Sequence, residues 1–332
     1  MRKLLLVGYS AENRTKASGY EHIVDFHDCD YDSEYMDAAR LPFGFIKTGQ
    51  RGKRINLYFL EIFSHIKSRK YDVIHNFYCD NQLLFRYPSK RKFAAIATTH
   101  LNYHNFSNYQ LKVLRSYDYV IVLNSKEERI LSEKGINAVY IPHGFNYPDF
   151  SLDAHILDNY KDKINICFSG VCYRDYDTLR FFIDNIKDRD DICLHILGQR
   201  KEVKDELREL NQDNIIVYDF LPDDTYYSIF SQCDYSFLPL TFATANNTLL
   251  EAEFLGIKTI IPNIEGTQDY ASEELNLLYN SHDELKGIIG KLQKEGKSQD
   301  LMDYAHRFDW NNVFAKTKDV YDQAYKKYHG ED

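Results

Sequence analysis

Short apolar runs alternate along the chain with longer stretches in which apolar residues recur at helical spacing. Apolar runs of about four to eight residues between polar or Gly/Pro turns predict buried strands, and the stretches between them predict helices. The predicted strands lie at 3–9, 22–28, 71–77, 93–100, 117–125, 138–144, 164–171, 192–199, 214–220, 234–240 and 258–263. Parallel strands need helical crossovers of this kind, so the pattern predicts an α/β protein with two doubly wound sheets.

The length of 332 residues supports two domains, because one domain usually holds roughly 100 to 200 residues. The stretch 142–163 is rich in turn formers and separates the two series of strands, so we expect the boundary there. This divides the chain into domains at 1–150 and 151–310. The remaining residues, 311–332, predict an amphipathic helix that packs back on the body.

The chain shows no sign of a membrane span or a secretory signal. It contains no apolar run of about 18 residues, and the apolar part of its N-terminal stretch is too short for a signal peptide. The six cysteines form no Cys-x-x-Cys pair and lie mostly in or beside apolar runs, which favours reduced, buried thiols over zinc sites or disulfides. We therefore expect a cytoplasmic protein.

The net charge of −9 is unevenly distributed. Residues 1–150 hold 21 Lys and Arg against 16 Asp and Glu, whereas residues 151–332 hold 20 against 34. The basic, amphipathic segment 47–70 is either a domain helix with a solvated cationic rim or a peripheral contact with a membrane that presents an anionic, lipid-linked acceptor. An acidic chain of this kind is not expected to bind nucleic acid.

One loop and helix in the second half have the composition of a nucleotide site. After the strand predicted at 234–240, Asn246 or Asn247 is a natural N-cap of a helix that Gly256 closes. The free N–H groups at the positive end of such a helix form a seat for a diphosphate. Glu251 lies about one turn further on, where a carboxylate suits the two vicinal hydroxyls of a ribose. Because parallel sheets bind ligands at the carboxyl ends of their strands, we expect this site in a cleft between the two sheets.

Several motifs together resemble one known family over nearly the full length of the chain. The stretch 239–256 keeps the family spacing of Pro239, Asn247, Leu249, Leu250, Glu251, Ala252 and Gly256. The stretch "VIVLNSKEERILSEKGINAVYIPHGFN" is similar to the end of the family's first domain, and "FSGVCYRDYDTL" is similar to the start of its second. The stretches "LHILGQ" and "NIIVYDFLPDD" continue the similarity. These motifs resemble glycosyltransferase family 4, the retaining glycosyl transferases group 1 with the GT-B fold.

The resemblance implies a hexosyltransferase with two Rossmann-like domains that face each other across a cleft. The first domain would bind a glycan or lipid-linked acceptor, and the second a nucleotide-sugar donor such as a UDP- or GDP-sugar. Among the catalytic residues, His100 would lean over the donor sugar, Arg174 would neutralise the β-phosphate and Glu251 would hold the ribose. The nucleotide-sugar site would also include Gly19, Gly170, Gly198, Leu221, Asn246, Asn247 and Thr248.

Two departures from the family pattern fall at this site. The family carries a glutamate eight residues before Glu251, on the ring hydroxyls of the donor sugar, and this chain has Ala243 there. The family's Gly-Arg pair is Gly170-Val171 here, so one phosphate-binding cation is missing unless Arg200 or Lys201 replaces it.

The family is generally interpreted as using front-face transfer, in which the departing phosphate oxygen accepts the proton of the acceptor. Helix amides and Arg174 would make a divalent metal unnecessary, so no cofactor is expected. The implied pathway is surface-polysaccharide biosynthesis. Two alternatives stay open: a nucleotide-sugar 2-epimerase, and a non-catalytic nucleotide-sugar-binding partner of another transferase. Each site residue also has a structural interpretation: an exposed helix residue for Glu251, a strand-end histidine for His100, and a surface ion pair with Asp175 or Asp177 for Arg174.

Overall fold

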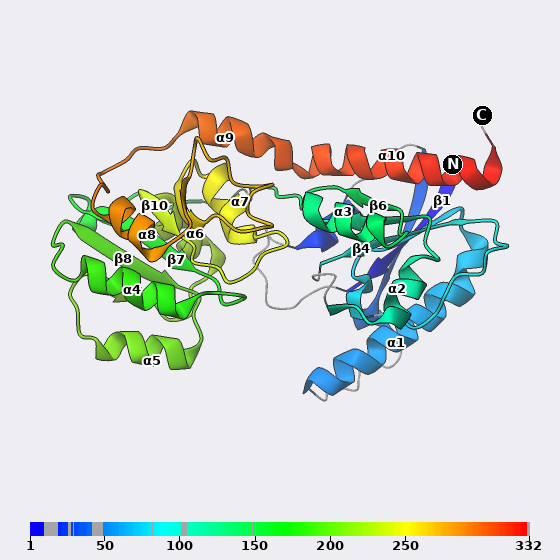
Figure 1. Ribbon diagram of the computed structural model, residues 1–332, viewed down its shortest axis with the longest axis horizontal. Helices are drawn as coiled ribbons and strands as arrows, with labels where there is room; N and C mark the ends of the chain where they lie inside the picture. The colour runs from blue at the N-terminus through cyan, green and yellow to red at the C-terminus, as the bar shows by residue number, and fades with distance from the viewer. Residues whose placement is uncertain are drawn as a thin grey trace. The chain divides into compact units, whose positions relative to one another are not determined.

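The computed structural model describes residues 1–9, 19–25, 28, 30–41, 49–81, 83–100, 105–147, 149 and 151–330 (Figure 1). Two compact units divide these residues. Unit 1 contains the described residues up to Gly144 together with those from Asp309 onward, and unit 2 is Phe145–Phe308. Each unit has a parallel six-stranded sheet with flanking helices, which confirms the predicted α/β class and its two doubly wound sheets.

The sheet of unit 1 has the order β2-β1-β3-β4-β5-β6. Its strands are β1 (Arg2–Gly8), β2 (Tyr31–Asp37), β3 (Val73–Asn76), β4 (Ala94–Thr99), β5 (Tyr119–Val122) and β6 (Ala138–Tyr140). Its α-helices are α1 (Gly49–Lys67), α2 (Asn108–Leu114), α3 (Ser125–Glu133) and α10 (Trp310–His329), and its short 3-10 helices are η1 (Tyr20–Asp25), η2 (Ala38–Arg40), η3 (Ser68–Lys70) and η4 (Cys79–Asn81).

The strand predicted at 22–28 is wrong. Tyr20–Asp25 is the 3-10 helix η1, and residues 26 and 27 of that prediction lie outside the described residues. The strand beside β1 is instead β2, whose middle residues are exposed. An edge strand has a neighbour on one side only and tolerates polar side chains, so the sequence "YDSEYMD" contains no apolar run that could have revealed it.

The sheet of unit 2 has the order β12-β11-β10-β7-β8-β9. Its strands are β7 (Ile164–Ser169), β8 (Ile192–Leu197), β9 (Ile215–Val217), β10 (Tyr235–Phe237), β11 (Lys258–Pro262) and β12 (Leu277–Tyr279). Its helices are η6 (Asp158–Tyr160), α4 (Tyr176–Ile186), α5 (Lys201–Glu209), α6 (Asp223–Ser231), α7 (Asn247–Phe254), α8 (His282–Ile289), α9 (Gln299–Ala305) and η7 (His306–Phe308).

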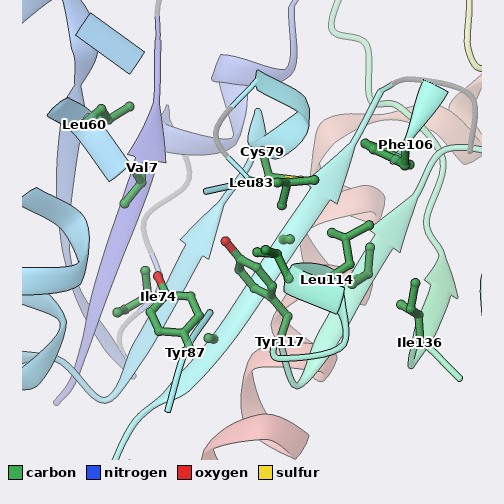
Figure 2. Close-up of a cluster of buried hydrophobic side chains, with 14 of the residues drawn as sticks. Val7, Leu60, Ile74, Cys79, Leu83, Tyr87, Phe106, Leu114, Tyr117 and Ile136 are labelled. Atoms are coloured by element: carbon green, nitrogen blue, oxygen red, sulfur yellow. The ribbon is translucent and has the colours of Figure 1, made fainter. Parts of the chain in front are cut away.

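Alternating strand residues fill the cores on the two faces of each sheet. In unit 2, Ile166 and Phe168 of β7 belong to one apolar cluster, and Cys167 between them belongs to the other. In unit 1, Val7 and Ile74 point to the face that α1 covers through Leu57 and Leu60 (Figure 2). Because helices cover both faces of each sheet, functional side chains are expected in the loops at the strand ends.

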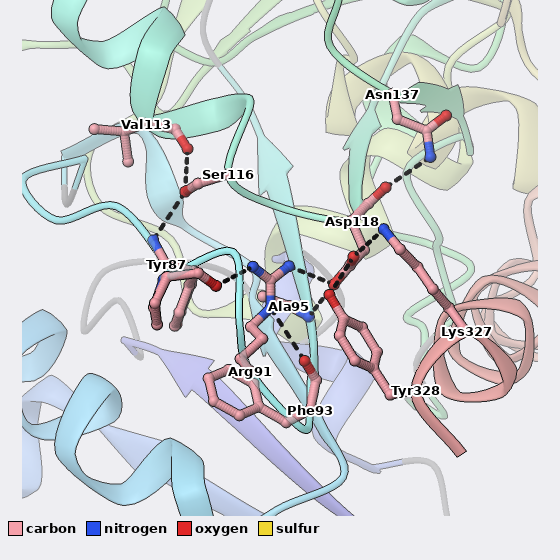
Figure 3. A network of polar contacts seen from close by, with 11 residues as sticks. Tyr87, Arg91, Phe93, Ala95, Val113, Ser116, Asp118, Asn137, Lys327 and Tyr328 are labelled. Atoms are coloured by element: carbon pink, nitrogen blue, oxygen red, sulfur yellow. Dashed lines mark hydrogen bonds and ion pairs between the residues drawn. The ribbon is translucent and has the colours of Figure 1, made fainter. Parts of the chain in front are cut away.

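Helix α10 packs on unit 1, against the sheet face opposite α1. The hydroxyl of Tyr321 lies 2.6 Å from Nδ1 of the buried His75, whose Nε2 lies 2.7 Å from Oγ1 of Thr98. At the far end of the helix, Lys327 and Tyr328 bind the buried carboxylate of Asp118 (Figure 3).

Asp118 also binds the guanidinium of Arg91 and the N–H of Ala95. Burial alone would raise the pKa of Asp118, but the hydrogen bonds from Lys327, Ala95 and Arg91 outweigh it and lower that pKa. The carboxylate therefore stays ionised and joins α10 to the sheet.

No helix among the described residues is both long and apolar enough to cross a membrane. The cysteines that the structure describes are unpaired. Cys172 is exposed, and the others, Cys79, Cys167, Cys193 and Cys233, are buried.

Candidate functional site

The strand order of unit 2 reverses between β7 and β10, and the segments that follow these two strands run side by side. The chain turns at Gly170, with φ +81°, and then Arg174 forms an antiparallel bridge with Leu240. The N–H of Asp175 donates to the carbonyl of Pro239 at 3.0 Å. Open α/β sheets bind ligands at such a reversal, beyond the carboxyl ends of the strands, so these two segments and α7 form the candidate site.

Arg174 is a buried cation in this site, with 7% of its surface exposed. Its Nε donates to the carbonyl of Ser169 at 2.7 Å, Nη1 to the carbonyl of Cys172 at 2.9 Å, and Nη2 to Oγ1 of Thr248 at 3.1 Å. Burial lowers the pKa of Arg174, but a guanidinium remains protonated near neutral pH. Among the described residues, its hydrogen bonds reach only uncharged oxygens.

The ion pair considered for Arg174 in the sequence does not form. Asp175 is instead the N-cap of α4, where its Oδ1 accepts from the N–H groups of Asp177 and Thr178. Asp177 binds Arg180, 2.9 Å away on the exposed side of the same helix. The acids that follow Arg174 are therefore engaged elsewhere.

Because Gly170 has no side chain, it leaves room for the guanidinium of Arg174. A Cβ at this position would lie 2.2 Å from Nη2 of Arg174 and 3.4 Å from Oγ1 of Thr248. Any side chain here would displace Arg174, in addition to the strain that a positive φ imposes.

Glu251 lies in α7 and is also buried, with 3% of its surface exposed. Its Oε2 accepts a hydrogen bond from the hydroxyl of Tyr226 at 2.9 Å and its Oε1 accepts one from Tyr227 at 3.0 Å. Burial raises the pKa of Glu251 to about 7, and the two tyrosine hydroxyls and Arg174 oppose that rise. Glu251 is thus not an exposed helix residue.

A ring of contacts joins the two charged groups. The hydroxyl of Tyr226 lies 2.9 Å from Oγ of Ser169, whose carbonyl binds Arg174. Thr248, which also binds Arg174, lies in the same helix as Glu251. Segments after β7 and β10 and helix α6 therefore fix one carboxyl and one guanidinium relative to each other.

The N-terminus of α7 borders this ring. Asn246 is the N-cap and accepts from the N–H of Leu249, while Asn247 is the first helical residue and Thr248 the second. The remaining N–H groups of the first turn have no acceptor inside the helix and carry its positive partial charge. Beside the cation of Arg174, this helix end is suited to an anion.

The other expected residues of unit 2 lie at neighbouring strand ends. Gly198 follows β8 with φ +63°, and a Cβ there would meet open space. The next residue, Gln199, donates from Nε2 to the carbonyl of Gly170 at 2.6 Å and so joins the loops after β7 and β8. Leu221 is half-buried and packs against the apolar cluster beneath α7.

The structure also shows the surroundings of Ala243, Arg200 and Lys201, the positions connected with the departures from the family pattern. Ala243 is buried, and a Cβ on Gly266 would lie 1.8 Å from its carbonyl oxygen, so the loops after β10 and β11 touch closely. Arg200 is the exposed N-cap residue of α5, and Lys201 starts that helix. Burial raises the pKa of Tyr176, and the positive charges of Arg200 and Arg174 oppose that rise.

The expected residues of unit 1 meet at its own strand ends. His100 follows β4, and its backbone N–H donates to the carboxylate of Asp80 at 3.0 Å. Its Nε2 lies 2.8 Å from the carbonyl of Phe77, which can only accept, so Nε2 carries a proton. The ring of Tyr20 packs edge-on against His100, with 5.1 Å between centroids.

Gly19 lies beside this histidine cluster and has φ +130°. A Cβ there would lie 2.4 Å from Oε2 of Glu21, which accepts from the hydroxyl of Tyr78 at 2.6 Å. The rings of Tyr78 and His100 lie 4.7 Å apart. Tyr20 and Tyr78 thus connect Gly19 to His100.

The sequence did not reveal the residues that hold the charged groups in place. Tyr226, Tyr227, Ser169 and Gln199 are neighbours of predicted site residues only in the fold. With 27 tyrosines in the chain, a Tyr-Tyr pair carries no signal of its own. The position of α6 beside α7 is the information that was missing.

A family model and one curated relative match the chain. Residues 163–294, which include Arg174 and Glu251, match the family model described as Glycosyl transferases group 1. An uncharacterised 41.2 kDa protein in the cps region of Klebsiella pneumoniae is 23% identical over 325 residues, covering 86% of this chain and 87% of that protein.

Solved structures show the same fold. Sucrose-phosphate synthase from Thermosynechococcus elongatus superposes with a TM-score of 0.68 at 16% identity, covering 98% of this chain and 89% of that one. Anabaena Alr3699/HepE, in complex with UDP and glucose, superposes with a TM-score of 0.65 at 14% identity, covering 97% of this chain and 100% of that one. The chain therefore has the GT-B fold, as expected from the sequence.

Proposed function

We propose that the chain is a retaining glycosyltransferase of family 4 that moves a hexose from a nucleotide-diphosphate sugar to a glycan or lipid-linked acceptor. Unit 2 binds the donor and unit 1 the acceptor. The match of residues 163–294 to the group 1 transferases supports the reaction class. HepE, whose structure contains UDP and glucose, supports a UDP-sugar as the donor.

The observation that carries the proposal is the buried guanidinium of Arg174 beside the N-terminus of α7. A buried charge is costly unless an opposite charge or strong hydrogen bonds compensate for it. Arg174 has carbonyl and hydroxyl partners but no ion pair among the described residues. The β-phosphate of a nucleotide sugar supplies the missing negative charge, and arginine is well suited to it because its donors form a rigid fork.

Glu251 holds the ribose in this proposal. Each of its oxygens already accepts one tyrosine hydroxyl, which fixes the carboxylate and leaves further lone pairs for the two ribose hydroxyls. The diphosphate then reaches Arg174, Thr248 and the first turn of α7, with Asn246 and Asn247 at its edge. Gly170 and Gly198 allow the backbone to approach the donor closely, and Leu221 packs at the base.

Transfer proceeds on one face of the sugar. The bond between the anomeric carbon and the β-phosphate oxygen breaks, and the acceptor oxygen bonds to that carbon from the same side. The acceptor proton passes to the departing phosphate oxygen. Arg174 and the α7 amides stabilise the charge that grows there, while His100 contacts the transferred sugar and Gly19 the bound substrates. No metal is needed in this scheme, so activity should survive chelation by EDTA.

A non-catalytic role is the second candidate, and Ala243 favours it. A methyl group stands where the family has a glutamate, and Val171 stands where it has an arginine. A chain with these changes could hold a nucleotide sugar through Arg174 and Glu251 as the partner of an active transferase. Arg200 and Lys201 are the cations available to replace the lost arginine.

Incubation with a panel of nucleotide sugars separates these functions. Ligand at about 100 times its Kd adds about 2.7 kcal/mol to the unfolding free energy, which raises Tm measurably. Stabilisation with release of the nucleotide supports the transferase, stabilisation with an intact donor supports the non-catalytic partner, and conversion of the donor to its C2 epimer supports an epimerase. Absence of stabilisation by every donor contradicts all three.

Arg174→Gln tests the site itself. Hydrogen bonds to charged groups contribute about 1.5–3 kcal/mol, so UDP affinity should fall about tenfold to hundredfold while uridine affinity changes little. Arg174→Lys should retain part of the UDP affinity. Arg180→Gln is the matched control, because Arg180 is exposed on α4 and binds Glu206 and Asp177. Glu251→Ala should weaken uridine and UDP equally, and unchanged affinity in that variant would refute the assignment.

The same proposal gives the chain a place in the cell. The cps-region relative suggests work in surface-polysaccharide biosynthesis. We place the chain in the cytoplasm, with peripheral contact to the inner membrane face through residues 47–70. Residues 47 and 48 lie outside the described residues, and α1 contains most of the rest.

A further inference from the structure

We infer that unit 1 carries a composite surface for anionic lipid, in which a loop held by the buried carboxyl of Glu61 adds a second anchor to α1. The exposed apolar residues of this surface are Tyr58 and Ile66 of α1, Leu84 and Phe85 of the loop, and Tyr109 of α2. The surface extends the proposed membrane contact beyond the segment 47–70, and it depends on the proposed function only for its purpose, which is to bring the chain to a lipid-linked acceptor.

The outward side of α1 carries apolar side chains between Tyr58 and Ile66. Tyr58, Ile62 and Ile66 follow one another at helical spacing, and Ile66 is 66% exposed. Phe59 and Phe63 stack beside them with 6.2 Å between ring centroids. The opposite side of the helix, with Leu57 and Leu60, fills the core, and Phe63 also packs against that core cluster. Tyr58 and Ile66 are the α1 side chains whose exposure the folding of unit 1 does not explain.

Two other segments extend this apolar strip. Phe85 is 43% exposed and Leu84 is 36% exposed, in the loop before β4. The ring of Phe85 lies 5.8 Å from that of His65 on α1. Tyr109 of α2 is 53% exposed and donates from its hydroxyl to the carbonyl of Leu84 at 2.5 Å. Helix, loop and second helix thus form one surface.

Glu61 holds the loop against α1. Its Oε1 accepts from the backbone N–H groups of Leu84 and Phe85, both at 2.8 Å. The residue is fully buried, and its Oε2 has no hydrogen-bond partner in the structure. Burying a carboxyl group that has only two backbone donors costs free energy. Here those two hydrogen bonds fix a loop whose large apolar side chains, Leu84 and Phe85, are exposed to water.

The segments that build this face are strongly basic. Residues 49–70 contain six Lys and Arg, 83–93 contain four and 105–115 contain two, against a single carboxylate, the buried Glu61. Not all of these cations are available, since Arg91 binds the buried Asp118. The exposed ones in the described part of the chain include Arg69, Lys70, Arg86 and Lys112.

This chemistry fits an anionic lipid surface. Apolar side chains enter the boundary between headgroups and acyl chains, and neighbouring Lys and Arg bind the headgroups. The chain as a whole has a charge of −9, but charges farther away than about 8 Å are largely screened at physiological salt. The local basic segments therefore decide the attraction.

Vesicle flotation with the full-length chain tests the inference. The chain should bind vesicles of phosphatidylcholine mixed with phosphatidylglycerol, bind phosphatidylcholine alone much less, and lose binding as salt is raised. The double variant Ile66→Ser/Phe85→Ser should bind at least about tenfold less. Phe220→Ser is the matched control, because Phe220 is 91% exposed in unit 2, and it should bind like the wild type.

The other outcomes overturn the inference. Equal binding to both kinds of vesicle, or wild-type binding by the double variant, would show that this face does not recognise anionic lipid. A dimer that dissociates only in the double variant would assign the face to a second copy of the chain. UDP binding by unit 2 is measured in parallel, so that loss of vesicle binding with normal UDP binding concerns this face alone, and loss of UDP binding concerns the proposed function.

Discussion

At the residue scale, the site is defined by two charged groups that the interior holds with uncharged partners. Arg174 has carbonyls and a hydroxyl, and Glu251 has two tyrosine hydroxyls. Sequence spacing predicted that both residues lie near neighbouring strand and helix ends, and the structure places them there. Their roles remain a proposal. Sequence spacing could not identify Tyr226 and Tyr227, because their role exists only where α6 meets α7.

The tyrosine pair predicts a pH dependence of nucleotide binding. Burial raises the pKa of Glu251 to about 7 and both hydroxyls oppose that rise. If the ionised carboxylate accepts the ribose hydroxyls, UDP affinity should weaken as pH falls through this value. Tyr226→Phe removes one opposing hydrogen bond and raises the pKa further, so the midpoint should move to higher pH.

Isothermal titration of UDP between about pH 5.5 and pH 8.5 covers the ionisation of this carboxyl and measures that midpoint. Tyr235→Phe is the control, since its hydroxyl binds the carbonyl of Gln293 rather than Glu251. An unshifted midpoint in Tyr226→Phe would show that the hydrogen bond from Tyr226 does not affect the ionisation of Glu251.

At the element scale, apolar periodicity predicted the buried strands and failed at an edge. The runs at β7 and β8 are apolar because both of their faces are covered. Asp32, Ser33 and Glu34 of β2 are exposed, so β2 has no apolar run. Its pairing with β1 is a contact between distant residues that a local sequence pattern does not show. Residues 22–25 of the run predicted at 22–28 belong to η1, where Ile23 and Tyr20 are buried.

The loop held by α1 predicts a pH dependence of stability. Burial raises the pKa of Glu61 from 4.5 to about 7, so the folded state binds this proton more tightly than the unfolded chain. The stability that this protonated carboxyl contributes is complete below about pH 4.5 and is lost as pH rises through about 7; it is on the order of 3 kcal/mol.

Glu61→Gln should remove this part of the pH dependence, because a neutral amide retains the carbonyl that binds the loop. Urea unfolding at about pH 5 and pH 8 should show a smaller difference for the variant than for the wild type. Glu34→Gln is a suitable control, since Glu34 is half-exposed and binds Lys67 at the surface. An equal pH difference in Glu61→Gln and wild type would show that Glu61 does not titrate in this range.

At the scale of the whole molecule, the sequence predicted two sheets and a C-terminal helix that packs back on the body. It did not predict which buried residues bind that helix. Asp118 after α2 and Lys327 in α10 are 209 positions apart. Nothing local marks Asp118 as a buried anion, because Asp also caps helices and closes turns throughout this chain.

Asp118→Asn should loosen the end of α10. Removing one partner of a buried ion pair costs about 3–5 kcal/mol, and here it leaves Arg91 buried without its anion. Hydrogen exchange of the last two turns of α10 should become faster, and the urea midpoint should fall. Lys326→Gln is a control at the neighbouring exposed position, and slow exchange in Asp118→Asn would show that the helix is held elsewhere.

The path of the chain also determines when each unit can be completed during synthesis. Among the described residues unit 2 is the continuous segment Phe145–Phe308, whereas unit 1 combines residues before it with the helix Trp310–His329 after it. On the ribosome, His75 and Asp118 emerge long before Tyr321 and Lys327. Unit 1 therefore cannot be completed before α10 is translated, and until then the sheet face that α10 covers is open to chaperones.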